Sequence, residues 1–346
     1  MIKSLITIAE NGYMPDFFIR IGIRRMQKER IIWSKTRSVS SIEEHHQSWV
    51  HKMKDSPIAY VPDKANEQHY EVPPLFFENV LGKHLKYSSG YWPDRINTLD
   101  GSEYEMLKLS SERAEIVDGQ NILELGCGWG SLTLYMAENY PKSSITAVSN
   151  SKDQRKFIES KCKERALDNV CVITADMNDF SIDDSFDRVV SIEMFEHMRN
   201  YELLLNRVAG WLKPGGKLFI HIFSHKTLVY PFTQEGEGDW MGRNFFSGGI
   251  MPSHQLLLYF QNDLRIESSW RISGTHYEQT SLAWLNKMDS RRNEIMGIFN
   301  ESYGKDQASI WFQRWRIFFM ACEVLFGCDY GREWGVSHYR FVKPGN

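Results

Sequence analysis

Residues 122–130 read ILELGCGWG, an apolar run with a single acid that ends in three alternating glycines. A helix-like spacing of apolar residues begins directly afterwards, at Ser131. This order predicts a buried strand, a tight turn and a helix N-terminus, the arrangement by which an α/β sheet holds a nucleoside-bearing ligand. Glycine suits the turn because the backbone bends sharply there and no Cβ keeps a ligand away.

The spacing of these glycines distinguishes between cofactor classes. A dinucleotide fingerprint reads G-x-G-x-x-G and faces a pyrophosphate, whereas the glycines here alternate and follow an acid. The pattern resembles motif I of the class I S-adenosylmethionine-dependent methyltransferases, in which the acidic loop faces the cationic amino-acid end of the cofactor. The alternative is a glycine-rich turn without a ligand. The resemblance implies cofactor contacts at Glu124, Gly126, Gly128 and Gly130.

Four later segments support a parallel, doubly wound sheet. Strands are expected over residues 144–150, 170–177, 186–192 and 212–220, the last with an LKPGG turn that is a signature of the same methyltransferases. The resemblance places polar residues at the ribose and an acid and an apolar residue at the adenine ring. These cofactor contacts are Ser149, Asn150 and Gln154 for the ribose, and Asp176 and Met177 for the adenine.

The end of the fourth expected strand carries three titratable groups within five residues. Residues 191–198 read SIEMFEHM, which places Glu193, Glu196 and His197 at the edge that faces the methyl sulfonium in this fold. Such groups can act as a general base, or as an electrostatic clamp, for an acceptor atom that loses a proton. The alternative is that Glu196 and His197 only cap the next helix. If Glu193 merely orients its neighbours, its replacement is expected to be milder than theirs.

At this segment the resemblance becomes specific to the coclaurine N-methyltransferases, a family related to the cyclopropane-fatty-acyl-phospholipid synthases and mycolic acid methyltransferases. It covers nearly the whole chain, most weakly before about residue 70, and adds Tyr87, Ser88, Ile192 and His197 to the implied cofactor contacts. The matching segments are residues 88–92, 98–99, 193–205, 225–227, 258–261, 273–276, 333–334 and 337–338.

The two branches of these relatives imply different acceptors. Lipid-modifying synthases hold a bicarbonate base on a Cys, a Glu, a His and a Tyr, and this chain has Glu196, His221 and Tyr277 but Ser89 in place of the Cys. The alkaloid enzymes instead use the acids and His of the E-x-F-E-H segment to deprotonate an amine. We therefore expect N-methylation of a small amine, an aromatic or alkaloid-like one among the candidates. The alternative is carbon transfer to the unsaturated acyl chain of a phospholipid. A third hypothesis, a regulatory protein that binds the cofactor without catalysis, predicts no turnover.

The remaining sequence completes the expected organisation. Residues 265–272 and 336–342 look like the last two strands, an antiparallel edge pair of a seven-stranded, mostly parallel sheet. Residues 1–85 are expected to form a helical extension and linker, residues 86–225 the Rossmann-like cofactor core, and residues 226–346 an aromatic-rich cap with the last strands. Residues 16–34 have the periodicity of a packed amphipathic helix, with membrane-surface contact the less favoured alternative. Its expected apolar face consists of Phe17, Phe18, Ile21, Ile23 and Met26. Residues 35–70 are polar and indicate a linker or mobile cover.

Composition narrows the class further. The net charge of −3 predicts no strong attraction to nucleic acid or to acidic lipid surfaces. Cys127 falls in the glycine loop and Cys171 in an expected core strand, and the five cysteines have no metal-ligand spacing, so we expect no metal and no disulfides. No run approaches the roughly 20 apolar residues of a membrane span, and the N-terminal apolar run is too short for a signal peptide. A cytoplasmic enzyme, a possible homodimer, is expected.

Overall fold

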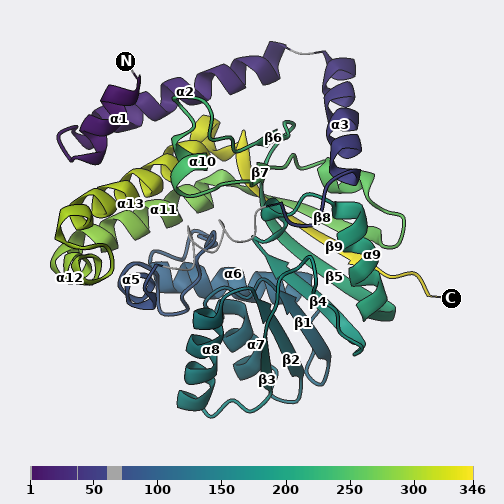
Figure 1. The fold of residues 1–346 in the computed structure, drawn as a ribbon. Helices are drawn as coiled ribbons and strands as arrows, with labels where there is room; N and C mark the ends of the chain where they lie inside the picture. Colours follow the sequence, from purple (N-terminus) through teal and green to yellow (C-terminus); the bar gives the residue numbers. More distant parts are fainter. Residues whose placement is uncertain (1, 37, 61–71, 346) are drawn as a thin grey trace.

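The computed structural model describes residues 2–36, 38–60 and 72–345. Its centre is a seven-stranded sheet with the strand order β3-β2-β1-β4-β5-β9-β8 (Figure 1). The strands are β1 (Asn121–Leu125), β2 (Ser144–Ser149), β3 (Val170–Thr174), β4 (Phe186–Ile192), β5 (Leu212–His225), β8 (Arg265–Ser273) and β9 (Trp334–Val342). Two short strands, β6 (Tyr230–Pro231) and β7 (Ile250–Met251), pair separately.

The direction of the strands confirms the expected sheet. The first five strands run parallel, which brings their carboxyl ends to one edge. Only β9 runs the other way, because it pairs antiparallel with β5 on one side and with β8 on the other. The antiparallel strand is thus inserted beside the edge, and β8 forms the edge itself.

Helices cover both faces of the sheet because neighbouring strand residues point in opposite directions. Ile122 packs among α6 and α7, whereas Leu123 packs among the residues of α9. The helices are α1 (Ile2–Glu10), α2 (Asp16–Thr36), α3 (Val39–Lys54), α5 (Pro74–Val80), α6 (Leu99–Arg113), α7 (Ser131–Asn139), α8 (Lys152–Glu164), α9 (Tyr201–Trp211), α10 (Trp240–Asn244), α11 (Gly274–Ser290), α12 (Arg292–Tyr303) and α13 (Lys305–Phe326).

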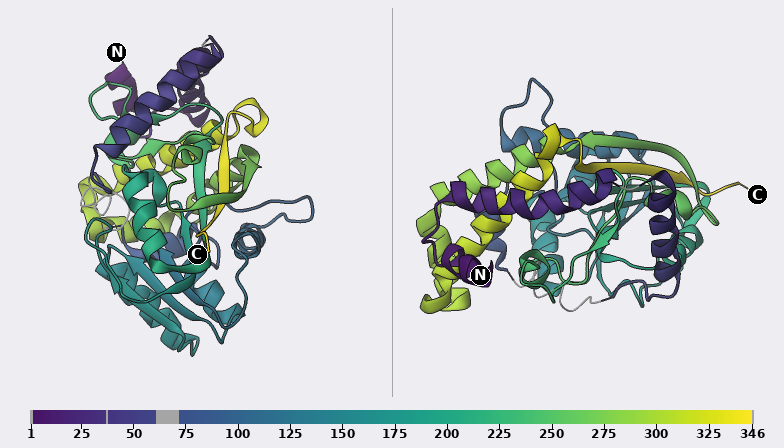
Figure 2. Two further views of the ribbon diagram at one scale, coloured as in Figure 1. Left: turned by 90° about the vertical axis from the view of Figure 1, so that its right-hand side faces the viewer. Right: turned by 90° about the horizontal axis from the view of Figure 1, so that it is seen from above.

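A helical cap lies beside the carboxyl edge of the sheet. It consists of α5 and α11–α13, with α1 and α2 lying against α13 (Figures 1 and 2). Ion pairs attach the two N-terminal helices to α13: Glu10 to Arg314 at 2.9 Å, Asp16 to Arg316 at 2.7 Å and Arg20 to Glu323 at 2.7 Å. The cap therefore combines the beginning and the end of the chain.

Two expectations for the N-terminal region need correction. The linker expected over residues 35–70 is wrong in its first half, because α3 forms there with Ser38 as its N-cap, while residues 61–71 lie outside the described part. In α2, Ile19 and Ile23 face the core, but Phe17 and Phe18, expected on the packed face, are 65% and 57% exposed. Packing against α13 thus uses a narrower face than the sequence pattern indicates.

Cys171 also differs from its expected place in the core. Its strand, β3, forms one edge of the sheet, and its side chain is exposed. All five cysteines are free thiols, of which Cys127 in the glycine loop and Cys162 in α8 are buried.

Candidate active site

Two adjoining hollows open at the carboxyl ends of β1, β2 and β4. They share Gly126, Gly128, Gln154 and His197, and the larger has about 1250 Å³ of free space with its solvent-open mouth included. Most of the predicted site residues line one or both of them. The larger is lined by Tyr87, Ser88, Glu124, Ile192, Glu193, Glu196 and Tyr277, and the smaller by Ser149, Asn150, Asp176 and Met177, in addition to the shared residues.

The glycine loop has the conformation that its sequence indicates. Gly126, Gly128 and Gly130 have φ angles of 77°, 53° and 80°, in the left-handed region where glycine is favoured. A Cβ on Gly128 would meet no atom within 4 Å, so it would project into the free space of the hollow. A Cβ on Gly130 would instead approach Ile158 to 2.7 Å. Gly130 does not line either hollow, and close packing against α8 accounts for its glycine.

Buried polar groups around the glycine loop fit a polar, partly cationic ligand. Glu124 accepts a hydrogen bond from the Thr133 hydroxyl, and burial raises the pKa of Glu124 to about 8. A cationic group beside Glu124 would favour its charged form. Gln154 Nε2 and Ser131 Oγ are buried without a hydrogen-bond partner among the described residues, which is the state expected of groups that await a ligand. The residues present therefore fit the expected cofactor.

Glu193 lies at the centre of a group of hydrogen bonds on the wall of the larger hollow. It directly follows β4 with φ = 46°, and its backbone N–H donates to the carbonyl of His221 at 2.8 Å. Its side chain, 10% exposed, accepts from the Tyr277 hydroxyl at 2.8 Å and lies 3.3 Å from Nε2 of His221. Left-handed backbone is unfavourable for a residue with a Cβ, and such strain is concentrated at functional sites.

The two acids of the segment differ in protonation. Burial raises the pKa of Glu193 to about 7, against the lowering influence of the Lys86 charge and the hydrogen bonds from Tyr277 and the Ser89 amide. Burial, together with the charge of Glu193, raises the pKa of Glu196 well above its usual range, and Glu196 Oε2 has no partner among the described residues. Near neutrality Glu193 can thus hold or release a proton, whereas burial favours the neutral form of Glu196.

Lys86 is a site residue that sequence reasoning missed. It lines the larger hollow, is 2% exposed, and its ammonium donates to the Ser88 hydroxyl. Burial lowers its pKa to about 8, while the charges of Glu193 and Glu103 act in the opposite direction. A lone lysine between apolar residues was the only signal in the sequence. His221 was predicted, but it lies behind Glu193 and does not line the hollow.

Much of the wall of the larger hollow is aromatic. The ring of His197 lies 4.5 Å from that of Phe246, and Tyr277 stacks on Phe326 at 4.1 Å. The remaining aromatic lining comes from Tyr87, Trp129, Phe223, Phe232, Trp284 and Phe318. Such walls suit planar or cationic organic molecules, by stacking and cation–π contact.

The described residues meet neither the requirements of a metal site nor those of a membrane-spanning helix. No three His, Cys, Asp or Glu side chains gather there in a way that could hold a metal ion. None of the helices over residues 2–36, 38–60 and 72–345 has both the length and the apolar character that a membrane crossing needs.

The sheet topology, the glycine loop and the acid–base segment together define an S-adenosylmethionine-dependent methyltransferase of class I. The family model of mycolic acid cyclopropane synthetase matches residues 61–332. The chain belongs to this family, which confirms the resemblance drawn from the sequence.

Comparison with individual relatives points to one branch of the family. The chain is 37% identical to (S)-coclaurine N-methyltransferase of Thalictrum flavum subsp. glaucum, over 99% of this chain and 96% of that one. It is 30% identical to cyclopropane-fatty-acyl-phospholipid synthase of Escherichia coli K12, over 81% of this chain and 69% of that one. The crystal structure of a coclaurine N-methyltransferase bound to N-methylheliamine and SAH superposes with a TM-score of 0.95, at 35% identity, covering 98% of this chain and 99% of that one.

Proposed function

We propose that the protein N-methylates a small amine, with S-adenosylmethionine as methyl donor and Glu193 as the group that removes the ammonium proton. The position of the Glu193 carboxylate carries the proposal: it lies on the wall of an aromatic hollow, beside the neutral acid Glu196. The relatives that cover nearly the whole chain bear the names of N-methyltransferases.

S-adenosylmethionine, when bound, supplies a methyl carbon that is already electrophilic. The residues that would hold it are Glu124, the loop of Gly126 and Gly128, Gln154 and Asp176, with the other predicted contacts around them. The protein has to orient the acceptor, exclude water and free the nitrogen lone pair. Ionised Glu193 takes one proton from the incoming ammonium and becomes a neutral acid, and the amine then has a lone pair with which to attack. His197 and Phe246 form part of the wall that orients it.

The lipid alternative depends on a bicarbonate, and three of its proposed ligands are otherwise engaged. His221 and Tyr277 already make hydrogen bonds to the Glu193 carboxylate. The Ser89 hydroxyl donates to the carbonyl of Gly90 at 2.9 Å and does not line either hollow. The Glu193 carboxylate thus occupies hydrogen-bonding groups that would otherwise hold bicarbonate. This favours an amine over a lipid as the methyl acceptor.

A bicarbonate test separates the two functions. With labelled S-adenosylmethionine and a panel of benzylic and cyclic amines beside unsaturated phospholipid vesicles, we expect label in an amine and none in lipid. Removal of dissolved bicarbonate is expected to leave the rate unchanged, because Glu193 supplies the base. A rate that falls without bicarbonate and recovers on its addition, with label in lipid only, would overturn the proposed function. Cofactor binding without turnover on either panel would favour the regulatory hypothesis.

We further propose the division of the chain expected above: a helical extension and linker over residues 1–85, the cofactor core over residues 86–225, and the substrate cap with the last two strands of the sheet over residues 226–346. The aromatic lining after residue 223 and the cofactor contacts before it support this division. A cytoplasmic location and a homodimer remain predictions.

A further inference from the structure

A chain of hydrogen bonds leads away from the active site, starting behind Glu193. From Glu193 Oε1 it passes to Nε2 of His221 at 3.3 Å, then from Nδ1 of His221 to Nε2 of His338 at 2.9 Å. It ends where Nη1 of Arg113 lies 2.9 Å from Nδ1 of His338. His221 and His338 are fully buried register partners on β5 and β9. The last two members, Arg113 and His338, have no role in the site as described so far.

Arg113 determines which atom donates and which accepts in each of these hydrogen bonds. A guanidinium only donates, so Nδ1 of His338 must accept. Burial and the nearby cations lower the pKa of both imidazoles well below the usual range, so each carries a single N–H. The proton of His338 is therefore on Nε2 and is donated to Nδ1 of His221. By the same reasoning His221 carries its proton on Nε2 and donates it to Glu193.

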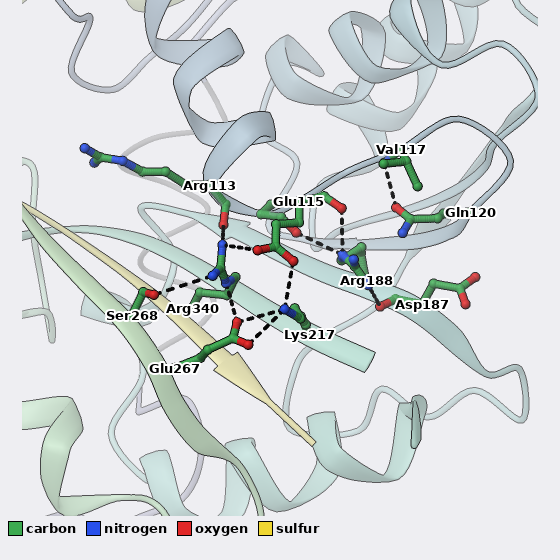
Figure 3. Close-up of polar contacts among 11 residues, drawn as sticks. Arg113, Glu115, Val117, Gln120, Asp187, Arg188, Lys217, Glu267, Ser268 and Arg340 are labelled. Atoms are coloured by element: carbon green, nitrogen blue, oxygen red, sulfur yellow. Dashed lines mark hydrogen bonds and ion pairs between the residues drawn. The ribbon is translucent and has the colours of Figure 1, made fainter. Parts of the chain in front are cut away.

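Arg113 is itself held in place at the C-terminus of α6. Its backbone carbonyl accepts from Nη1 of Arg340 at 3.0 Å, and its guanidinium lies 4.9 Å from the ring centre of Trp270. In Figure 3 its carbonyl faces Arg340, while its side chain extends away from the ionic cluster of Glu115, Lys217 and Glu267. The guanidinium is thus fixed by its surroundings without being neutralised by that cluster.

We propose that Arg113 and His338 are positioning residues for methyl transfer, which act through His221 to keep an N–H pointed at Glu193. The proposal rests on the proposed function of Glu193 as proton acceptor. A donated N–H stabilises the ionised form of the carboxylate. Without Arg113 the two imidazoles can adopt the opposite tautomers, in which His221 turns a lone pair toward Glu193 and favours its protonated form.

Several other groups face the same carboxylate and are common to every variant below. They are Lys86 before α6, the Ser89 amide, Glu196 after β4, Tyr277 on α11 and Cys322 on α13. The imidazoles are also influenced by the charge of Lys86. None of these groups is altered in the variants. A change in the pKa of Glu193 on substitution of Arg113 or His338 therefore reports on the series of hydrogen bonds from Arg113 to Glu193.

The tautomers can be observed directly. Nitrogen NMR of the imidazole rings in the full chain, assigned with a His338→Gln variant, is expected to show two neutral histidines with the proton on Nε2 throughout the neutral pH range. In Arg113→Met we expect a mixture of tautomers at His338. A proton on Nδ1 of either ring in the wild-type protein, or a charged ring at neutral pH, would overturn the proposal.

The kinetic test compares matched variants. In Arg113→Met and His338→Leu we expect kcat to fall roughly tenfold, on the scale of a hydrogen bond to a charged group. The rising limb of the pH–rate profile is expected to move to higher pH by about one unit. His338→Gln is expected to restore most of the rate, because an amide both accepts and donates. Arg95→Met removes a guanidinium that pairs with Glu105 on the same helix but contacts neither Arg113 nor His338, and it is expected to leave the limb in place.

The outcomes separate the two proposals. If Glu193→Gln keeps the wild-type rate, the proposed function fails. If Glu193→Gln is inactive and the limb does not move in Arg113→Met, then the positioning role fails and these residues only support the fold. Should His338→Leu not fold, the comparison of Arg113→Met with His338→Gln gives the same decision.

Discussion

Glu193→Gln is expected to lower turnover by roughly 10²- to 10⁴-fold, because the amide cannot accept the ammonium proton. The affinity for S-adenosylmethionine is expected to change little, since Glu193 does not line the smaller hollow that holds the predicted ribose and adenine contacts. In the wild-type protein kcat is expected to rise with pH through about 7, the raised pKa of Glu193, because only the ionised form takes up a proton. Initial rates across the neutral pH range, with calorimetry for the cofactor, measure both effects.

Glu196→Gln is the matched control for this prediction. Burial keeps Glu196 protonated, and an amide has nearly the shape of a neutral carboxylic acid and the same lack of charge. Its effect on turnover is therefore expected to be far smaller than that of Glu193→Gln. An inactive Glu196→Gln variant beside an active Glu193→Gln variant would show that the two acids have the opposite roles.

Gly128→Val is expected to weaken binding of S-adenosylmethionine by roughly 100-fold or more, equivalent to about 3 kcal/mol. No atom lies within 4 Å of the position of an added Cβ, so we expect the branched side chain to fill space left for the ligand without disrupting the fold. The left-handed φ of 53° adds a conformational penalty of about 1–2 kcal/mol. Calorimetric titration of the purified variant gives the affinity, and thermal unfolding gives the stability.

Gly119→Val is the control that separates two effects of Gly128→Val: the loss of space for the cofactor and the conformational cost of a side chain at a positive φ. Gly119 also has a positive φ, 91°, with no atom within 4 Å of an added Cβ, but it lies in an exposed turn before β1. The two variants are expected to lose similar stability, and only Gly128→Val is expected to lose cofactor affinity. Wild-type affinity in Gly128→Val would contradict the assignment of the glycine loop to the cofactor.

Local patterns made the sheet and the cofactor side of the site predictable. An apolar strand followed by a glycine turn can be recognised within a few residues, and β2 and β4 begin at the expected residues. α3 was missed because its buried face includes His46, which is 1% exposed and hydrogen-bonded to Ser253. A polar residue interrupts the apolar stripe by which a helix is recognised.

The relative importance of the candidate catalytic residues could not be predicted, because it depends on contacts between distant parts of the chain. Arg113 and His338 are 225 residues apart in sequence, and His338 was noted only as part of a matching segment. Neighbours in sequence led to the expectation of a minor role for Glu193. Its contacts with His221 and Tyr277, from two other elements, lead us to the opposite weighting.

The ion pairs that attach α1 and α2 to α13 have a consequence for the order in which the enzyme is assembled. Each pair joins residues 300 or more positions apart, and α13 contributes Phe318, Cys322 and Leu325 to the wall of the hollow. Closing such long loops is slow compared with forming the neighbouring strands and helices of the sheet. During synthesis the sheet through β5 can form while α13 is still untranslated, whereas the first two helices lack their ion-pair partners on α13 until the ribosome has nearly finished. The nascent chain can therefore complete its cofactor-binding half well before it has a chamber for the acceptor.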